Sequence, residues 1–234
     1  RQVPFVDKPH QGLKKLGMSY AAAYGDLDND GDLDIYVTQS ERWKRYVYDW
    51  FYINNGDGTF SVSPLSEQVS MPDVWTGGAV WADYDNDGWQ DIYVANDRVV
   101  FENQLYRNNG DGTFRESLRS YFGHTSRFSM GSDAADINND GRPDLISLDM
   151  LPQEEVPLKS SEGDDNIQTQ RMRIGEYGYY YQFTRNMLYV NQPDGHFMET
   201  ALMSGVAATD WSWSALFADF DQDGYQDLFV SNGI

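Results

Sequence analysis

Residues 26–34 read DLDNDGDLD, and three further segments of the chain repeat this pattern. The repeats are DYDNDGWQD at residues 83–91, DINNDGRPD at 136–144 and DFDQDGYQD at 219–227. A short apolar stretch precedes and follows each nonapeptide, for example IYV after the first two. An apolar run, a tight polar loop and a second apolar run predict a β-hairpin. Four copies of this unit indicate a repeat protein.

A second motif follows each of the first three nonapeptides. It reads FYINNGDGTF at residues 51–60, LYRNNGDGTF at 105–114 and, more loosely, LYVNQPDGHF at 188–197. The Asn-Gly and Asp-Gly steps supply the positive φ angles that a hairpin turn requires. Each repeat then holds two hairpins, and four strands per repeat are the sequence signature of a β-propeller blade.

We therefore expect an all-β fold, with residues 1–234 forming one β-propeller segment of about four blades. The first and last blades are expected to be incomplete. VPFVDKPHQGL at residues 3–13 resembles the outermost strand of an earlier blade, and LFVSNGI at 228–234 stops after the second strand of the fourth. Propellers close with roughly four to eight blades. We expect a part of a larger ring, and a self-closed four-bladed ring is the alternative.

Residues 150–185 interrupt the repeat. The first half of this insertion is polar and contains Pro152 and Pro157, which predicts a loop. The second half carries four tyrosines, Tyr177, Tyr179, Tyr180 and Tyr181. Long loops on a rigid scaffold often carry function. These tyrosines are therefore candidate contacts to a ligand or partner, and the alternative is that they cap a blade.

The nonapeptides have the composition of calcium loops. Several carboxylates within nine residues repel one another, and a hard cation with six to eight oxygen ligands relieves that repulsion. Side chains at positions one, three, five and nine can bind the ion, glycine at position six permits the sharp turn, and position seven offers its backbone carbonyl. The predicted ligands are Asp26, Asp28, Asp30, Asp32 and Asp34; Asp83, Asp85, Asp87, Trp89 and Asp91; Asp136, Asn138, Asp140, Arg142 and Asp144; and Asp219, Asp221, Asp223, Tyr225 and Asp227.

Two alternatives to four structural Ca²⁺ sites can be weighed from the sequence. An EF-hand needs glutamate at position twelve and a helix on either side, but position twelve here is Val37, Val94, Ser147 or Val230 within a predicted strand. Mg²⁺ is less suitable because it gives up its water reluctantly. One such loop could be an ordinary acidic turn, whereas four copies at blade spacing favour calcium. Asn138 removes one carboxylate, so the third site should be the weaker.

Composition excludes several classes of function. The formal net charge is -20, from 37 acidic and 17 basic residues, which does not suit binding to nucleic acid or an anionic membrane. The chain has no cysteine, so disulfides and thiolate sites are excluded. No apolar run approaches the roughly 20 residues that span a bilayer. No signal peptide is visible and the chain begins with Arg1, so we expect a mature or trimmed segment.

The four loops and LYRNNGDGTF, together with ATDWSWSALFADFDQDGYQDLFVSNG at residues 208–233, resemble the FG-GAP/VCBS repeat family. That family includes the propeller of integrin α-subunits and the bacterial ASPIC/UnbV-associated, cartilage acidic protein-like VCBS-repeat proteins. The resemblance implies a propeller, commonly seven-bladed, with Ca²⁺ in the inter-strand loops. It also implies an extracellular or cell-surface location, secreted or associated with a bacterial outer membrane. The family has no single activity.

The function that these features favour is a non-catalytic, Ca²⁺-stabilised binding or scaffold module for a protein or glycan ligand. A carbohydrate-active propeller enzyme, a lyase or hydrolase, is one alternative, and a subunit of a cell-surface assembly is another. No catalytic residue is predicted, because His10, His124 and His196 lie far apart and no G-x-S-x-G motif occurs.

Aromatic residues near the starts of the predicted inner strands are a further candidate surface. They are Tyr20, Trp75, Phe128, Trp211 and Trp213. Such residues could line a face of the ring and stack on sugars, but packing between neighbouring blades is the favoured interpretation.

Overall fold

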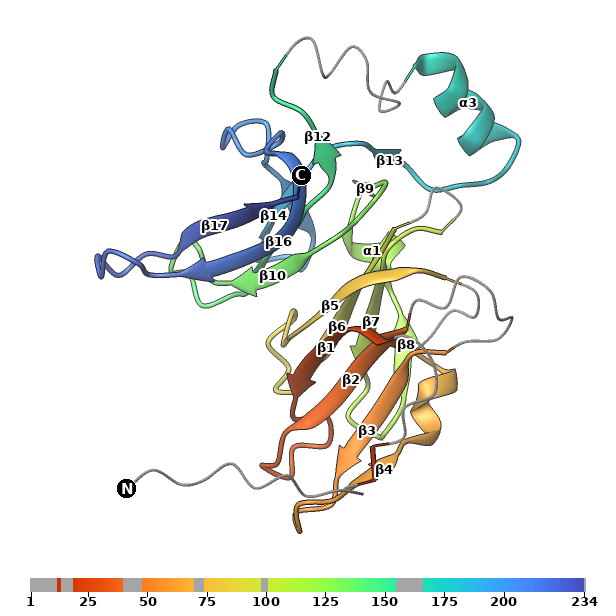
Figure 1. Ribbon diagram of the computed structural model, residues 1–234, viewed down its shortest axis with the longest axis vertical. Coiled ribbons are helices and arrows are strands. Elements are labelled where there is room, and N and C mark those ends of the chain that lie inside the picture. The colour runs from red at the N-terminus through yellow and green to blue at the C-terminus, as the bar shows by residue number, and fades with distance from the viewer. Residues whose placement is uncertain are drawn as a thin grey trace.

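The structure is a computed structural model that describes residues 12–13, 19–39, 48–69, 74–97, 101–154 and 166–233. Its main elements are four antiparallel sheets, arranged as the blades of a β-propeller (Figure 1). This arrangement confirms the predicted all-β propeller fold. The predicted strand at residues 3–13 lies outside the described residues except for Gly12 and Leu13.

The first three sheets have four strands each, and the fourth has three. The first sheet contains β1 (Ser19–Gly25), β2 (Asp34–Gln39), β3 (Trp50–Asn54) and β4 (Phe60–Val62) in that order. The second contains β5 (Thr76–Ala82), β6 (Asp91–Asn96), β7 (Gln104–Asn108) and β8 (Phe114–Glu116). The third contains β10 (Ser132–Ala135), β11 (Asp144–Ser147), β14 (Met187–Asn191) and β15 (Phe197–Glu199). The fourth has the order β12 (Met150–Leu151), β16 (Asp210–Ala218) and β17 (Asp227–Asn232).

The insertion leaves the third sheet after β11 and returns to it at β14, with Leu145 opposite Tyr189. It contains a helix, α3 (Ile167–Gly175), where the sequence predicted only a loop. Asn166 caps this helix by accepting hydrogen bonds from the N–H groups of Gln168 and Thr169. The insertion then forms β13 (Gln182–Phe183), which pairs in parallel with β9 (Thr125–Ser126). Short helices follow β4 and β8, namely η1 (Pro64–Glu67) and α1 (Leu118–Tyr121).

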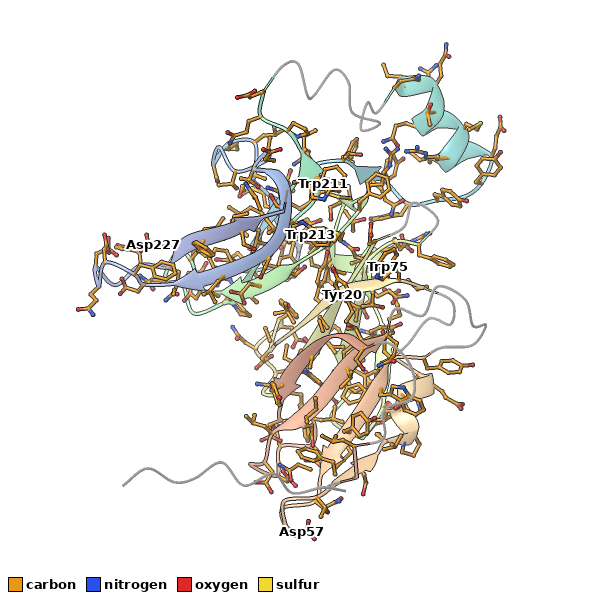
Figure 2. The ribbon with its side chains drawn as sticks, viewed as in Figure 1. Tyr20, Asp57, Trp75, Trp211, Trp213 and Asp227 are labelled. Carbon is orange, nitrogen blue, oxygen red and sulfur yellow. The ribbon has the colours of Figure 1, made fainter. Side chains whose placement is uncertain are left out.

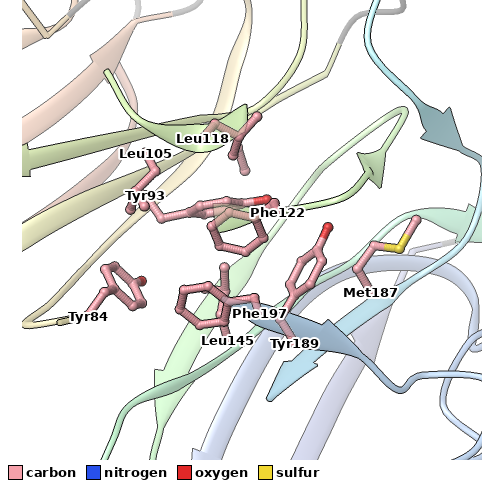
Figure 3. Close-up of a cluster of buried hydrophobic side chains, with 10 residues drawn as sticks. Tyr84, Tyr93, Leu105, Leu118, Phe122, Leu145, Met187, Tyr189 and Phe197 are labelled. Atoms are coloured by element: carbon pink, nitrogen blue, oxygen red, sulfur yellow. The ribbon is translucent and has the colours of Figure 1, made fainter. Parts of the chain in front are cut away.

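The apolar core lies between neighbouring sheets. Residues of the second and third sheets, with α1, form one cluster (Figure 3). In this cluster the rings of Phe122 and Phe197 stack with centroids 4.4 Å apart, and Tyr189 meets Phe122 edge-on at 4.7 Å. Two similar clusters lie between the first and second sheets and between the third and fourth. The hydrophobic effect therefore fixes each blade mainly through its neighbours.

Inner strands of neighbouring blades also approach closely. A Cβ atom on Gly77 of β5 would lie 2.5 Å from the carbonyl oxygen of Ser129. One on Gly131, just before β10, would lie 2.6 Å from the carbonyl oxygen of Trp213. Glycine at these two positions permits the contact between successive blades.

The same position of the repeat is buried in some sheets and exposed in others. The second residue after the nonapeptide is buried in the first three sheets, as Tyr36, Tyr93 and Ile146. Its counterpart on the fourth sheet, Phe229, is 55% exposed. Tyr24, on the opposite side of the first sheet, is 62% exposed. The fourth sheet therefore presents an apolar side chain on the side that the next blade covers in the first three sheets. In the described part of the chain, no helix has the length and apolar character needed to cross a bilayer.

Candidate metal centres

Each nonapeptide forms the same turn between the first and second strands of its sheet. In the first loop, Asp26 accepts hydrogen bonds from the N–H groups of Asp30 (3.1 Å) and Gly31 (3.0 Å), and Asp30 accepts one from Asp32 (2.9 Å). The backbone is left-handed at positions four and six, with φ of 57° at Asn29 and 92° at Gly31. The same bonds recur in the other three loops. The predicted sharp turn at the glycine is therefore present.

The aspartate at position nine connects the loop to its sheet. Asp91 is fully buried and accepts hydrogen bonds from the N–H groups of Tyr84 in its own loop (3.2 Å) and Asn108 at the end of β7 (2.8 Å). Burial raises the pKa of Asp91 to about 7. Asp34 and Asp144 make the equivalent two bonds, and burial raises the pKa of both.

Carboxylates converge in three of the loops. Positions one, three and nine each place an oxygen within 4.8 Å of the others in the first, second and fourth loops. The three groups are Asp26, Asp28 and Asp34; Asp83, Asp85 and Asp91; and Asp219, Asp221 and Asp227. Carboxylate oxygens are the hard donors that Ca²⁺ prefers, and three of them converge in each group. Asp85 Oδ1 is also buried and accepts no hydrogen bond from any described residue. The residues present therefore fit a bound cation.

Other predicted ligands take different positions. The carboxylates at position five are outside these three groups and accept the N–H of residue seven, as Asp87 does from Trp89 (2.9 Å). In the third loop Asn138 stands beside Asp136, Asp140 and Asp144, so the loop keeps its turn with one carboxylate fewer. The backbone carbonyls of Asp32, Trp89, Arg142 and Tyr225 stay predicted ligands.

Two arginines contact loop carboxylates. The Nη2 atom of Arg107, on β7, contacts Asp85 and lies 3.3 Å from Asp87 Oδ2. Arg142, at position seven of the third loop, contacts Asp140 through Nη2 and donates Nε–H to the carbonyl of Asn191 (3.2 Å). Positive charge thus lies beside the second and third loops.

Asparagines connect successive loops, a feature that the sequence analysis missed. The side-chain amide at position four donates to the glycine carbonyl at position six of the next loop. These bonds are Asn29 to Gly88 (2.9 Å), Asn86 to Gly141 (3.1 Å) and Asn139 to Gly224 (3.0 Å). The signal available in the sequence was asparagine itself, which tolerates positive φ and can donate a hydrogen bond.

The asparagine that ends the third strand also links two blades. The Asn108 amide donates to the carbonyl of Leu27 in the preceding loop (3.0 Å), and Asn191 donates to that of Tyr84 (2.7 Å). Sequence analysis assigned no role to this asparagine, only to the Asn-Gly and Asp-Gly steps that follow it in the first two repeats. Positive φ in that turn occurs at the glycines, for example Gly56 (71°) and Gly58 (82°).

The four tyrosines of the insertion have two different environments. Tyr180 donates its hydroxyl hydrogen to the carbonyl of Phe122, and the Arg119 guanidinium lies 5.0 Å from its ring centroid. Tyr179 packs 5.7 Å from Tyr177, while Tyr177 and Tyr181 are exposed. Tyr181 borders a groove of about 550 Å³ lined by Ile167, Gln170, Arg171, Ile174, Gly175 and Phe183.

Figure 2 shows Tyr20 of β1 close to Trp75, and Trp211 and Trp213 on β16 of the fourth sheet. Tyr20 and Trp75 meet edge-to-face at 6.4 Å, and Trp211 and Trp213 are about half exposed. Tyr20 is also 41% exposed, so packing between blades accounts for only part of the surface of Tyr20, Trp211 and Trp213.

The histidines do not assemble a site within the described residues. His124 lies beside Arg185 and Glu199, whereas His196 is exposed next to Asp194. His10 is outside the described residues.

Comparison with known proteins gives one family match. A model of the FG-GAP-like repeat matches residues 26–94, 83–147 and 178–230, which together make up most of the chain. No curated protein matches.

Proposed function

The chain belongs to the FG-GAP-like repeat family, and from this premise we propose that it is a non-catalytic binding or scaffold module whose blades are stabilised by Ca²⁺. The ions bind in the nonapeptide loops, about one to each loop. The surface of the propeller then presents a binding site for a protein or a glycan.

The position-nine aspartate is the observation that carries the calcium proposal. Asp91 is buried, accepts a hydrogen bond from the third strand and belongs to the group of converging carboxylates. A cation in the loop would stabilise the ionised form of this group and remove its repulsion with Asp83 and Asp85. Metal binding and folding of the blade are then coupled, because the same carboxylate serves both.

An extracellular or cell-surface location is part of the proposal. Extracellular calcium modules work with dissociation constants of roughly 0.1 to 1 mM. The loops have exposed carboxylates at position five and, in the third loop, one ligand charge fewer. Sites of this kind suit a compartment that is rich in calcium.

Thermal unfolding of metal-free protein tests the calcium proposal. Adding Ca²⁺ to about 100 times its dissociation constant should stabilise the fold by about 2.7 kcal/mol for each occupied site. Mg²⁺ at the same concentration should stabilise it much less. A metal count on the dialysed protein should give close to four Ca²⁺ per chain. No bound metal and no shift of the melting temperature would contradict the proposal.

The groove beside α3 is the proposed contact surface. It combines the apolar side chains of Ile174 and Phe183 with the exposed ring of Tyr181, and exposed aromatic residues are enriched at binding sites. Tyr177→Ala combined with Tyr181→Ala should abolish binding found on a glycan array or by co-purification. Tyr24→Ala, at an exposed tyrosine on the first sheet, should retain it. Release of shortened glycan by the wild-type protein would instead indicate an enzyme.

A further inference from the structure

The second nonapeptide loop has a guanidinium among its carboxylates. The Nη2 atom of Arg107 contacts Asp85 and lies 3.3 Å from Asp87 Oδ2. The Nε atom of the same arginine lies 4.0 Å from Asp91 Oδ2. The side chain of Arg107 is only 14% exposed, so water screens these contacts less than at a free surface. Asp85 and Asp91 belong to the group whose oxygens converge. Arg107 therefore lies against two of the three carboxylates that converge in this loop.

A second set of contacts holds Arg107 from the other side. Its Nη1 donates a hydrogen bond to the hydroxyl of Tyr121 on α1 (2.7 Å), and its guanidinium carbon lies 5.5 Å from the Tyr121 ring centroid. The guanidinium thus bridges the loop and α1. If Nη2 leaves the loop, the contacts with Tyr121 can still hold the side chain.

The fold does not require arginine at this position. The residue that precedes the third-strand asparagine is Ile53 in the first repeat and Val190 in the third. Both of these strands form the same pairings as β7. A purely structural role for Arg107 would be to pack β7 against α1. That role leaves unexplained why Nη2 points into the loop.

We infer that Arg107 is a tethered cation that competes with Ca²⁺ for the second loop. This inference rests on the proposed binding of calcium by the loops. Nη2 contacts Oδ2 of Asp85, and Asp85 is one of the carboxylates that Ca²⁺ would bind, so the two positive charges repel each other and the ion has to displace the guanidinium. Arg107 stabilises the loop when calcium is scarce and weakens the binding of calcium there. The first loop has converging carboxylates at the same three positions but no such arginine. The second loop should therefore fill at a higher calcium concentration than the first.

The arginine of the third loop does not have this role. Arg142 contacts Asp140, which is at position five and outside the converging carboxylates of the other loops. Its side chain is 26% exposed, compared with 14% for Arg107.

Three substitutions in the full chain test the inference. Arg107→Ile installs the residue of the first repeat, and Ile53→Arg transfers the arginine to the first loop. Arg115→Ile is the matched control, because Arg115 is exposed and lies opposite Arg107 on β8. Tb³⁺, a luminescent analogue of Ca²⁺, reports on the second loop when it is excited through Trp89, and Trp89→Phe should abolish that signal. Melting temperatures in chelator and in Ca²⁺ give an independent readout.

Arg107→Ile should lower the Tb³⁺ concentration that half-saturates the Trp89 signal by about tenfold or more. Its melting temperature should fall in chelator and recover in Ca²⁺, whereas loss of packing alone would lower both. Ile53→Arg should weaken one Ca²⁺ site, and Arg115→Ile should change neither quantity. If the wild type and Arg107→Ile bind Ca²⁺ and Tb³⁺ equally well, the inference is wrong while the calcium proposal stands. If neither chain binds either ion, the calcium proposal itself fails, and the inference fails with it.

Discussion

The position-nine aspartate combines a structural role with the proposed metal-binding role, and its four copies allow the two roles to be separated. Asp91 is buried and accepts two backbone N–H groups, from Tyr84 and Asn108. Asp227 is exposed and, among the described residues, accepts only the N–H of Phe220 (3.0 Å). Both belong to converging carboxylate groups. Asp91 therefore has a structural role that Asp227 largely lacks.

Asp91→Ala should reduce stability even without metal, whereas Asp227→Ala should reduce it only when calcium is present. The first substitution leaves two buried N–H groups without an acceptor. It also removes a carboxyl whose burial is costly, so we expect a net loss of about 1–3 kcal/mol in chelator. For Asp227→Ala we expect less than about 1 kcal/mol in chelator, because its site is open to water. Denaturant unfolding in chelator and in Ca²⁺, with a metal count, measures both. Equal losses in chelator would contradict the separation of roles.

At this scale the sequence predicts local chemistry well and long-range partners poorly. The convergence of Asp26, Asp28 and Asp34 could be predicted because they are close in sequence and the pattern occurs four times. The bond from Asn29 to Gly88 could not, because it joins loops of different blades. The contact of Arg107 with Asp85 likewise depends on the pairing of β7 with β6.

Strand residues at the same position of different repeats differ in whether a neighbouring blade covers them. Ile146 on β11 and Phe229 on β17 occupy the same repeat position. Ile146 packs in the cluster between the third and fourth sheets, while Phe229 is 55% exposed. The contribution of this position to stability therefore depends on whether a neighbouring blade covers it.

Ile146→Ala should destabilise the described fold by about 2–4 kcal/mol, because it creates a cavity between two blades. Phe229→Ala should cost less than about 1 kcal/mol, since its ring is mostly in water. Phe229→Ala should also raise solubility by reducing an exposed apolar face. Denaturant unfolding of both variants in Ca²⁺ measures the difference. Comparable losses would mean that Phe229 is covered in solution, for instance by another blade or a second chain.

The elements were predictable where they repeat and not where they occur once. The hairpins of the first three blades could be inferred because each apolar run recurs beside a known type of turn. The helix α3 occurs once, and its contacts include the Asn166 cap and a bond from Gln170 to the carbonyl of Gln182 (2.8 Å). The parallel pairing of β9 with β13 joins segments more than 50 residues apart and leaves no local pattern.

For the molecule as a whole, the dominant electrostatic fact is its excess of acidic residues, with a formal charge of -20. Several carboxyls are also buried within the sheets. Asp49 accepts hydrogen bonds from the hydroxyls of Tyr36 (2.7 Å) and Thr76 (3.1 Å), and Asp149 accepts the N–H groups of Arg127 and Phe128. Burial raises the pKa of both to about 6, and that of Asp91 to about 7. Protonation and the proposed binding of calcium are therefore two ways to reduce the same excess of negative charge.

Metal-free and calcium-loaded protein should respond to pH in opposite directions. Because these folded-state pKa values exceed the unfolded value of about 3.9, the metal-free folded chain binds more protons than the unfolded chain. Stability from this source is fully present below about pH 4 and is lost as pH rises through about 6 to 7. The melting temperature without metal should therefore rise as pH falls from about 7.5 to about 5, with each group contributing about 2 kcal/mol.

Calcium reverses this dependence because it binds only the ionised carboxylates. In saturating Ca²⁺ the melting temperature should be highest near neutral pH and should fall as protons displace the ion. The melting temperatures with and without Ca²⁺ should therefore converge as the pH is lowered. Thermal melts of dialysed protein at a series of pH values, with and without Ca²⁺, measure this convergence. Asp49→Asn removes one buried titrating group that is not part of a loop. It should weaken the pH dependence of the melting temperature without metal and leave unchanged the rise in melting temperature that Ca²⁺ causes. Curves that stay parallel across the whole range would show that calcium binding and carboxylate ionisation are not linked in this protein.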